Sequence, residues 1–266
     1  MQYIENSSFE QLQQWFYEST GILFNDSKRP LVSGRLQKRI RQMQLNNLAE
    51  YFELLRRDEA EQQVAINLLT TNETYFFRES KHYDFLTSDV LPALTKQEKV
   101  SVWSAASSSG QEAYSIAMLM AKQWGLFKPW HIHGTDINTQ VLKLAQRGVY
   151  PIDASEKIPA DLLKRYCVKG KGKDTGFFMV MPDLKKHVTF KQTNLLKVNP
   201  IQSSYDVIFL RNVLIYFNMD EKLQILSNVL NHLRPGGWLF VGHSESVTGF
   251  DTRLQQVKPG CYRFIV

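Results

Sequence analysis

The first seventy residues place hydrophobic side chains at helical intervals. We predict four helices there, over residues 8–21, 29–44, 47–57 and 61–70. In the second of these segments one face is apolar, and it carries Val32, Leu36, Ile40 and Met43. Gly21 suits the end of the first helix, and Pro30 suits the first turn of the second. The apolar face is expected to lie in the core.

From about residue 100 the pattern changes to short β-rich runs that alternate with helical ones. The expected strands cover residues 99–105, 131–137, 187–194, 205–212, 236–243 and 261–266. Helical patterns separate several of them, at residues 110–125, 139–148 and 219–233. This alternation predicts an α/β fold with a doubly wound, mostly parallel sheet.

A glycine-rich segment interrupts this alternation. The stretch from about 165 to 190 contains Gly170, Gly172 and Gly176, followed by alternating and aromatic residues. It predicts a small antiparallel β-hairpin inserted in the sheet domain. We therefore expect a helical domain over residues 1–70 and a sheet domain over residues 71–266 that carries the insertion.

Polar side chains follow the predicted strands, at the edge where doubly wound sheets bind their ligands. They are Ser107 to Gly110 with Glu112, then Asp136, Asn194, Arg211 and Asn212. Asp136 follows the second strand, and an acid at that position suits hydrogen bonds to the two hydroxyls of a ribose. A single strand-end acid can equally cap the next helix. Four polar strand ends in register favour a binding site.

The turn of residues 104–112 narrows the choice of cofactor. It reads SAASSSGQE, contains Gly110 as its only glycine, and matches neither glycine-rich phosphate-binding motif. Glu112 falls in the first turn of the following helix, where its carboxylate would repel a phosphate and attract a cation or an amine. S-Adenosylmethionine has a ribose, a sulfonium and an α-ammonium group but no phosphate. The residues therefore favour this cofactor and a methyl transfer.

Composition and cysteine use exclude several classes of protein. The chain is 43% hydrophobic and 22% charged, which is ordinary for a soluble globular protein. Cys167 and Cys261 are far apart and lack partners at metal-ligand spacing, so we expect neither a disulfide framework nor a metal site. The most apolar run, residues 205–218, is interrupted by charge and too short to span a bilayer. The first residues do not resemble a signal peptide, and we expect a cytoplasmic protein.

Basic charge is concentrated near the N-terminus. The net charge is +6, and no acid occurs between Ser27 and Ala49. That segment carries six basic residues: Lys28, Arg29, Arg35, Lys38, Arg39 and Arg41. Arg35, Lys38 and Arg39 share one helical face, with no acid nearby in the sequence. This face is either a contact surface for an acidic partner or a solvated surface.

Several motifs resemble those of the CheR-type chemotaxis receptor methyltransferases, in the order found in that family. They are LLTTNETYFFRES at 68–80, WSAASSSGQEAYSIAM at 103–118, GTDINTQVLKLAQRGVY at 134–150, and FLRNVLIYFN and LRPGGWLFVGHSES at 209–218 and 233–246. The resemblance implies a helical domain followed by a Rossmann-like, S-adenosylmethionine-dependent methyltransferase domain. It also implies methylation of glutamate side chains on the cytoplasmic bundle of membrane chemoreceptors, which is the adaptation step of chemotaxis and leaves S-adenosylhomocysteine.

The same resemblance implies roles for individual residues. The expected cofactor-binding residues are Asn72, Thr74, Arg78, Glu112, Asp136, Asn194, Leu195, Arg211 and Asn212. We expect Arg78 and Tyr216 to orient the acceptor carboxylate and so to be the catalytic residues, although Tyr216 is also explained by packing. The segment His243 to Glu245 is assigned a structural or pocket-lining role, and Tyr75, Phe76 and Phe77 are expected to pack.

The expected partner is the cytoplasmic domain of a chemoreceptor, met by the basic helix. A receptor C-terminal peptide would add as an edge strand to the inserted hairpin. We expect a monomer that binds no nucleic acid. Two alternatives stay open: a nucleic-acid methyltransferase, suggested by the basic charge, and a non-catalytic module. Base-amine methylases place an N/D-P-P-aromatic motif where this chain reads RNVLIYF, and the intact polar positions disfavour a non-catalytic module.

Overall fold

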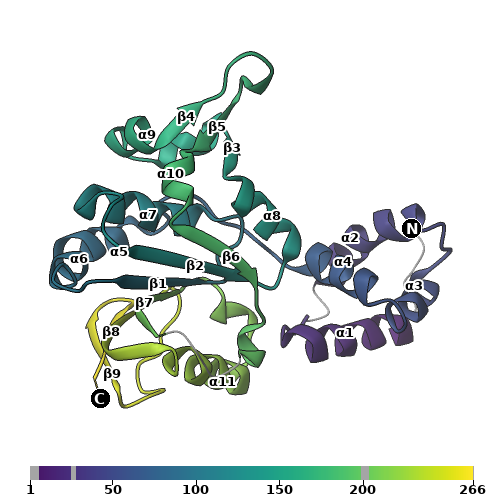
Figure 1. Cartoon of the computed structure of the whole chain (residues 1–266). Coiled ribbons are helices and arrows are strands. Elements are labelled where there is room, and N and C mark those ends of the chain that lie inside the picture. The colour runs from purple at the N-terminus through teal and green to yellow at the C-terminus, as the bar shows by residue number, and fades with distance from the viewer. Residues whose placement is uncertain (1–5, 25–27, 199–203, 266) are drawn as a thin grey trace.

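Four helices form a domain at the N-terminal end of the chain (Figure 1). The computed structural model describes residues 6–24, 28–198 and 204–265; Ser27, at the start of the acid-free segment, lies outside them. The helices are α1 (Asn6–Thr20), α2 (Arg29–Gln42), α3 (Leu48–Leu55) and α4 (Glu59–Leu69). Their apolar faces enclose a separate core, in which Val32, Leu36 and Ile40 of α2 are buried as predicted. Side chains of Asn47 and Asp58 cap α3 and α4.

The second part of the chain is built on a seven-stranded sheet. Its strands are β1 (Val100–Ala105), β2 (Trp130–Asp136), β6 (Val188–Gln192), β7 (Tyr205–Leu210), β8 (Leu233–Val241), β9 (Leu254–Lys258) and β10 (Cys261–Phe264). Their order is β6-β2-β1-β7-β8-β10-β9. The five strands from β6 to β8 are parallel, and β10 is antiparallel to both of its neighbours, β8 and β9. The predicted mostly parallel sheet is confirmed.

Helices cover both faces of this sheet, so that its central strands contribute to two cores. The larger helices are α7 (Gln111–Trp124), α8 (Thr139–Arg147) and α11 (Met219–Leu230). Ahead of β1 lie α5 (Ser80–Phe85), a π-helical turn (Leu86–Val90) and α6 (Leu91–Ala93). Along β7, Val207 and Phe209 join the core on the α7 side, whereas Ile208 and Leu210 join the core on the α11 side. This alternation is the doubly wound arrangement that the sequence predicts.

A small antiparallel sheet projects from one end of the domain (Figure 1). It contains β3 (Val149–Pro151), β4 (Cys167–Lys169) and β5 (Phe177–Val180), in the order β3-β5-β4. Around it lie α9 (Ala160–Tyr166), α10 (Pro182–Lys185) and 3-10 turns at Ile152–Lys157 and Gly172–Asp174. The predicted hairpin corresponds to β4 and β5. The third strand, β3, comes from residues directly after α8 and was not predicted.

The helical domain contacts the carboxyl edge of the large sheet at two places. On one side Asn138 donates its side-chain amide to the carbonyl of Asn67 at 3.0 Å and to the hydroxyl of Thr70 at 2.8 Å. On the other side Asn194 donates to the carbonyl of Ser19 at 3.0 Å. These contacts hold α1 and α4 over the ends of the strands. Among the described helices, none combines the length and apolar character needed to cross a membrane.

Candidate functional site

A cavity lies between the helical domain and the carboxyl ends of β1, β2 and β7. All ten residues that the sequence singled out line it: Asn72, Thr74, Arg78, Glu112, Asp136, Asn194, Leu195, Arg211, Asn212 and Tyr216. The helical domain closes the remaining wall with Thr20 and Lys28, which the sequence did not assign to a site, and with Arg35, which was expected on the receptor-contact face. The structure therefore brings residues from distant segments to one enclosed space.

Strained backbone is concentrated at this cavity. Six non-glycine residues of the described chain have a positive φ: Gln44, Phe77, Glu79, Ala106, Ser108 and Asn212. Ala106, Ser108 and Asn212 line the cavity, and Phe77 and Glu79 flank Arg78, which also lines it. Such conformations persist where neighbouring contacts over-determine them, and they cluster at functional sites. Their distribution points to this cavity as the functional site.

The turn after β1 brings backbone close to the cavity. At its end Gly110 has φ +92, and a Cβ there would lie 2.8 Å from the Cβ of Ala145. Glycine is therefore required by both the backbone angle and the close approach of α8. Within the turn, the amide of Ser108 donates to the Asp136 carboxylate at 2.9 Å. The single glycine of the SAASSSGQE segment thus caps the start of α7, whereas Ser107 and Ser108 form part of the cavity wall.

Asp136 ends β2 with only 7% of its surface exposed. Its two oxygens accept hydrogen bonds from the amides of Asn138 and Ser108, each at 2.9 Å. Burial raises the pKa of Asp136, and these backbone hydrogen bonds oppose the rise. The side chain of Asn138, not that of Asp136, caps α8. Each carboxylate oxygen can accept a second hydrogen bond, so Asp136 retains acceptor capacity toward the cavity.

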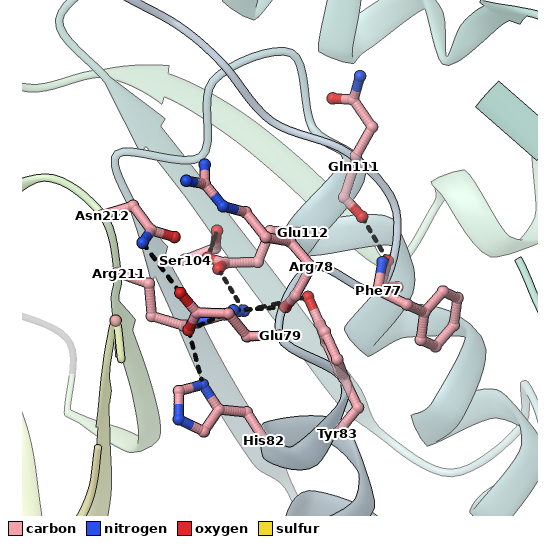
Figure 2. Close-up of polar contacts among 12 residues, drawn as sticks. Phe77, Arg78, Glu79, His82, Tyr83, Ser104, Gln111, Glu112, Arg211 and Asn212 are labelled. Carbon is pink, nitrogen blue, oxygen red and sulfur yellow. Dashed lines mark hydrogen bonds and ion pairs between the residues drawn. The ribbon is translucent and has the colours of Figure 1, made fainter. Parts of the chain in front are cut away.

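A buried ion-pair cluster forms the wall beside β7. The side chain of Arg211 is 1% exposed, and its guanidinium lies 3.0 Å from Glu79 and 3.1 Å from Glu112 (Figure 2). It also donates to the carbonyl of Arg78 and to the hydroxyl of Tyr83. Burial lowers the pKa of Arg211, but the neighbouring carboxylates outweigh this effect and raise it. Arg211 is therefore a permanent cation with fixed contacts.

Glu112 is held in place from two directions. Its Oε1 accepts from the Ser104 hydroxyl at 2.7 Å, and its Oε2 accepts from Arg211 (Figure 2). Burial raises the pKa of Glu112, and the charge of Arg211 opposes that rise. Its carboxylate lies in the cavity wall at the first turn of α7. This position places a carboxylate, paired with Arg211, where it can also contact a cationic or ammonium-bearing ligand.

Arg78 and Tyr216 occupy the same cavity from different segments. Arg78 is half-buried, and its guanidinium donates to the carbonyl of Glu73 at 2.8 Å, which leaves further donors unassigned. Tyr216 ends the 3-10 turn Leu214–Tyr216 and is half-buried. Burial raises the pKa of Tyr216, whereas the charge of Arg78 lowers it. The prediction that three adjacent aromatics pack is wrong for Tyr75, which is 42% exposed beneath the Arg78 guanidinium, while Phe76 is fully buried.

Two glutamates have structural contacts here: Glu79, to which the sequence assigned no role, and Glu245, which was expected to be structural or pocket-lining. Glu79 follows Arg78 and binds Arg211, Asn212 and the backbone amide of His243. Glu245 is buried and accepts from the amides of Gly242, Asn212 and Ile215, so it fixes the loops after β7 and β8. Their only signal in the sequence is their place inside the quoted motifs.

Two of the three cations expected on the contact face of α2 have partners inside the helical domain. Arg35 donates to the carbonyls of Leu69 and Thr70, at 3.0 and 3.2 Å. Arg39 forms a two-pronged ion pair with Glu61, which lies 22 residues away in the sequence. Lys38 is exposed. Two of the three cations therefore hold the helical domain together, and Lys38 is left on its surface.

Comparison with known proteins covers both domains. The family model described as "CheR methyltransferase, all-alpha domain" matches residues 7–70, and "CheR methyltransferase, SAM binding domain" matches residues 72–262. "Chemotaxis protein methyltransferase 2" of Pseudomonas aeruginosa is 41% identical over 240 residues, which is 90% of this chain and 86% of that protein. "Chemotaxis protein methyltransferase" of Escherichia coli is 36% identical over 255 residues, which is 94% of this chain and 88% of that protein.

Proposed function

The chain belongs to the CheR family of S-adenosylmethionine-dependent methyltransferases, and we propose that its cavity is where glutamate side chains of chemoreceptors are methylated. The observation that carries the proposal is the convergence of ten predicted residues on one cavity between the two domains. We place the boundary of the helical domain at residues 70 and 71. A cytoplasmic monomer fits a substrate on the cytoplasmic part of a receptor.

The donor groups of the cavity fit S-adenosylmethionine. Asp136 retains acceptor capacity for the ribose hydroxyls, and the Glu112 carboxylate suits the ammonium and sulfonium charges. Asn194 and Leu195 would flank the adenine, and Asn72, Thr74, Arg78, Arg211 and Asn212 would complete the pocket. When bound, the cofactor supplies an electrophilic methyl group on sulfur.

The acceptor glutamate needs orientation and no general base. A glutamate carboxylate has a pKa of about 4.3 and is ionised at neutral pH. Fixing two reactants in line contributes roughly 7–11 kcal/mol toward lowering a barrier. Arg78 and Tyr216 are placed to orient this carboxylate, because both line the cavity and neither is fully buried. A single arginine and a hydroxyl hold the anion without the stronger stabilisation that would weaken its attack.

The assay that tests this function is methyl transfer from radiolabelled S-adenosylmethionine to soluble cytoplasmic fragments of chemoreceptors. Label should enter the receptor as a glutamyl methyl ester, which is released as methanol by mild base. Total RNA and DNA serve as alternative acceptors and should remain unlabelled. Label in nucleic acid instead of receptor would contradict the proposal, as would binding of the cofactor without any transfer.

Replacing Tyr216 with phenylalanine should lower kcat by about tenfold, because a hydrogen bond to a charged acceptor is lost. The affinity for S-adenosylhomocysteine should stay unchanged, because the tyrosine hydroxyl is assigned to the acceptor. Steady-state kinetics at saturating receptor, with calorimetry of cofactor binding, would measure both quantities. Tyr75→Phe is the matched control, since it removes an exposed hydroxyl from the linker beside Arg78. Unchanged turnover in Tyr216→Phe would assign Tyr216 to packing alone.

The basic helix is proposed to meet the acidic receptor bundle through its exposed cations. Of the three predicted contact residues, Arg35 and Arg39 have structural contacts within the helical domain, so Lys38 is the one to substitute. Lys38→Glu should slow receptor methylation a few-fold at low salt and leave cofactor binding intact, because exposed charges act on encounter rates. Lys96→Glu, an exposed lysine ahead of β1, is the control. Equal rates and equal salt dependence in both variants would make the face a solvated surface.

The small sheet is proposed to bind a receptor C-terminal peptide. Its strand β4 lies at one edge of the sheet, next to β5, and Val168 in it is exposed. An unpaired strand edge can accept an extended peptide through main-chain hydrogen bonds. Substituting proline for Lys169, whose amide points away from β5 because that of Gly170 donates to Phe177, should abolish binding of such a peptide, measured by fluorescence anisotropy, without lowering methylation of a receptor fragment that lacks the peptide. Unaltered peptide binding would remove β4 from the interface.

A further inference from the structure

Glu79 has a backbone conformation that is unusual for its residue type. Its φ of 60° and ψ of 64° lie in the left-handed region, directly before α5. A residue with a Cβ occupies this region rarely and keeps it only where surrounding contacts impose it. Glycine would adopt it without strain. A glutamate in this conformation indicates that its side-chain contacts hold the backbone in place.

The Glu79 carboxylate joins segments that are distant in the sequence (Figure 2). Its Oε1 accepts from the Asn212 amide at 3.0 Å. Its Oε2 accepts from Arg211 at 3.0 Å and from the His243 backbone amide at 3.2 Å, and it lies 3.4 Å from Nδ1 of His82. Burial would raise the pKa of Glu79, but the Asn212 hydrogen bond and the Arg211 charge lower it below its usual range. The carboxylate is therefore ionised and fully engaged.

Glu79 and Glu112 share the guanidinium of Arg211 from two sides. Nη2 of Arg211 faces Glu79, and Nη1 faces Glu112. Because a guanidinium is planar and rigid, the position of one carboxylate constrains the position available to the other. Without the Glu79 charge, Arg211 would be paired with Glu112 alone. The Glu112 charge would then be more fully neutralised and less available to a cationic ligand in the cavity.

Glu79 is absent from the described residues that line the cavity, whereas Arg211, Asn212 and Glu112 all line it. We propose that Glu79 is a positioning residue, which orients Arg211 and Asn212 and thereby keeps Glu112 available to the cofactor. The inference rests on the proposed function of the cavity as the cofactor site. It assigns to Glu79 an effect on cofactor affinity without direct contact.

The charges around Glu79 disfavour a metal site, which is the other role that its two histidine neighbours suggest. Glu79, His82 and His243 each offer a metal-ligating atom within 4.8 Å of the others. However, Lys81 and Lys258 line the same hollow, and Arg211 already binds the Glu79 oxygen that faces His82. A further cation beside these charges would be repelled. These charges disfavour a metal ion at Glu79, and metal binding there would overturn the proposal.

The test compares Glu79→Gln with Asp206→Asn in the full chain. In glutamine an NH2 donor replaces one of the two carboxylate oxygens, so an acceptor can no longer face both Arg211 and Asn212 as Oε2 and Oε1 do in Glu79. Asp206 is a matched control, because it is buried at the opposite end of β7 and is paired with Arg234 at 2.8 Å. We expect Glu79→Gln to weaken S-adenosylhomocysteine binding by about tenfold. Asp206→Asn should change the affinity by less than about twofold even where its Tm falls further.

Glu79→Asp provides a second variant that retains the negative charge. Its carboxylate is one methylene shorter and cannot span Arg211 and Asn212, so an intermediate loss of affinity is expected. Wild-type affinity in both Glu79 variants would overturn the proposal, as would stoichiometric Zn²⁺ binding that Glu79→Gln abolishes. A failure of the Glu79 proposal can be told apart from a failure of the proposed function. If the proposed function is wrong, the unaltered chain will bind no cofactor or transfer no methyl group.

Discussion

Replacing Arg211 with methionine is expected to lower the free energy of unfolding by about 3–5 kcal/mol, because removing one partner leaves buried charge uncompensated. The side chain of Arg211 is 1% exposed and pairs with Glu79 and Glu112, neither of which has another cation as an ion-pair partner among the described lysines and arginines. The variant should also lose S-adenosylhomocysteine binding, because both carboxylates would be free to move or to take up protons. Urea unfolding with calorimetry of the surviving folded protein would measure both effects.

The loss of stability in Arg211→Met should depend on pH. The guanidinium charge lowers the pKa of both glutamates in the folded chain, so removing it raises both pKa values. A carboxyl group whose pKa is raised in the folded state favours folding at low pH, and this contribution is lost as the pH rises. The deficit relative to the unaltered chain should therefore be smaller at pH 5 than at pH 8. Arg56→Met, in an exposed pair with Glu53, should change stability little at either pH. Similar, small losses in both variants would mean that the Arg211 cluster contributes little.

Replacing Asp136 with alanine should weaken S-adenosylmethionine binding by about tenfold or more, because a hydrogen bond to a charged group contributes about 1.5–3 kcal/mol. Asp136 lies at the end of β2, and each of its oxygens accepts one backbone hydrogen bond. Each oxygen can therefore still accept a second hydrogen bond from the ribose. Calorimetry of the folded variant measures the affinity directly.

A ligand that lacks one ribose hydroxyl tests whether Asp136 binds the ribose directly or only holds the turn after β1 in place. The unaltered chain should bind the 2′-deoxy analogue of S-adenosylhomocysteine more weakly than the parent compound. Asp136→Ala should bind the two compounds with similar affinity, because the partner of the hydroxyl is already absent. An equal penalty for the analogue in both proteins would place the ribose away from Asp136.

The sequence predicted those features that depend on local periodicity and on the geometry of parallel sheets. Helices such as α2 follow from apolar residues at intervals of three and four, and strands such as β7 from buried runs. Because parallel strands end at one edge, Asp136 and Arg211 were expected to lie together, and they line the same cavity. These arguments need no knowledge of side-chain partners.

Features that depend on pairing between distant residues were not predictable. The ion pair of Arg39 with Glu61 requires the packing of α2 on α4, which no local pattern reports. Glu79 adopts a left-handed conformation that is typical of glycine, and only its contacts with Arg211 and Asn212 account for it. Strand β3 has three residues, too few for an alternating pattern, and it forms by pairing with β5.

The most direct test of the central claim is a crystal structure of the chain with S-adenosylhomocysteine. The account predicts the ligand in the cavity between the helical domain and the strand ends. Its ribose hydroxyls should lie within hydrogen-bonding distance of Asp136, its ammonium beside Glu112, and its sulfur on the side of Arg78 and Tyr216. A ligand bound outside this cavity, or with its ribose away from Asp136, would contradict the account.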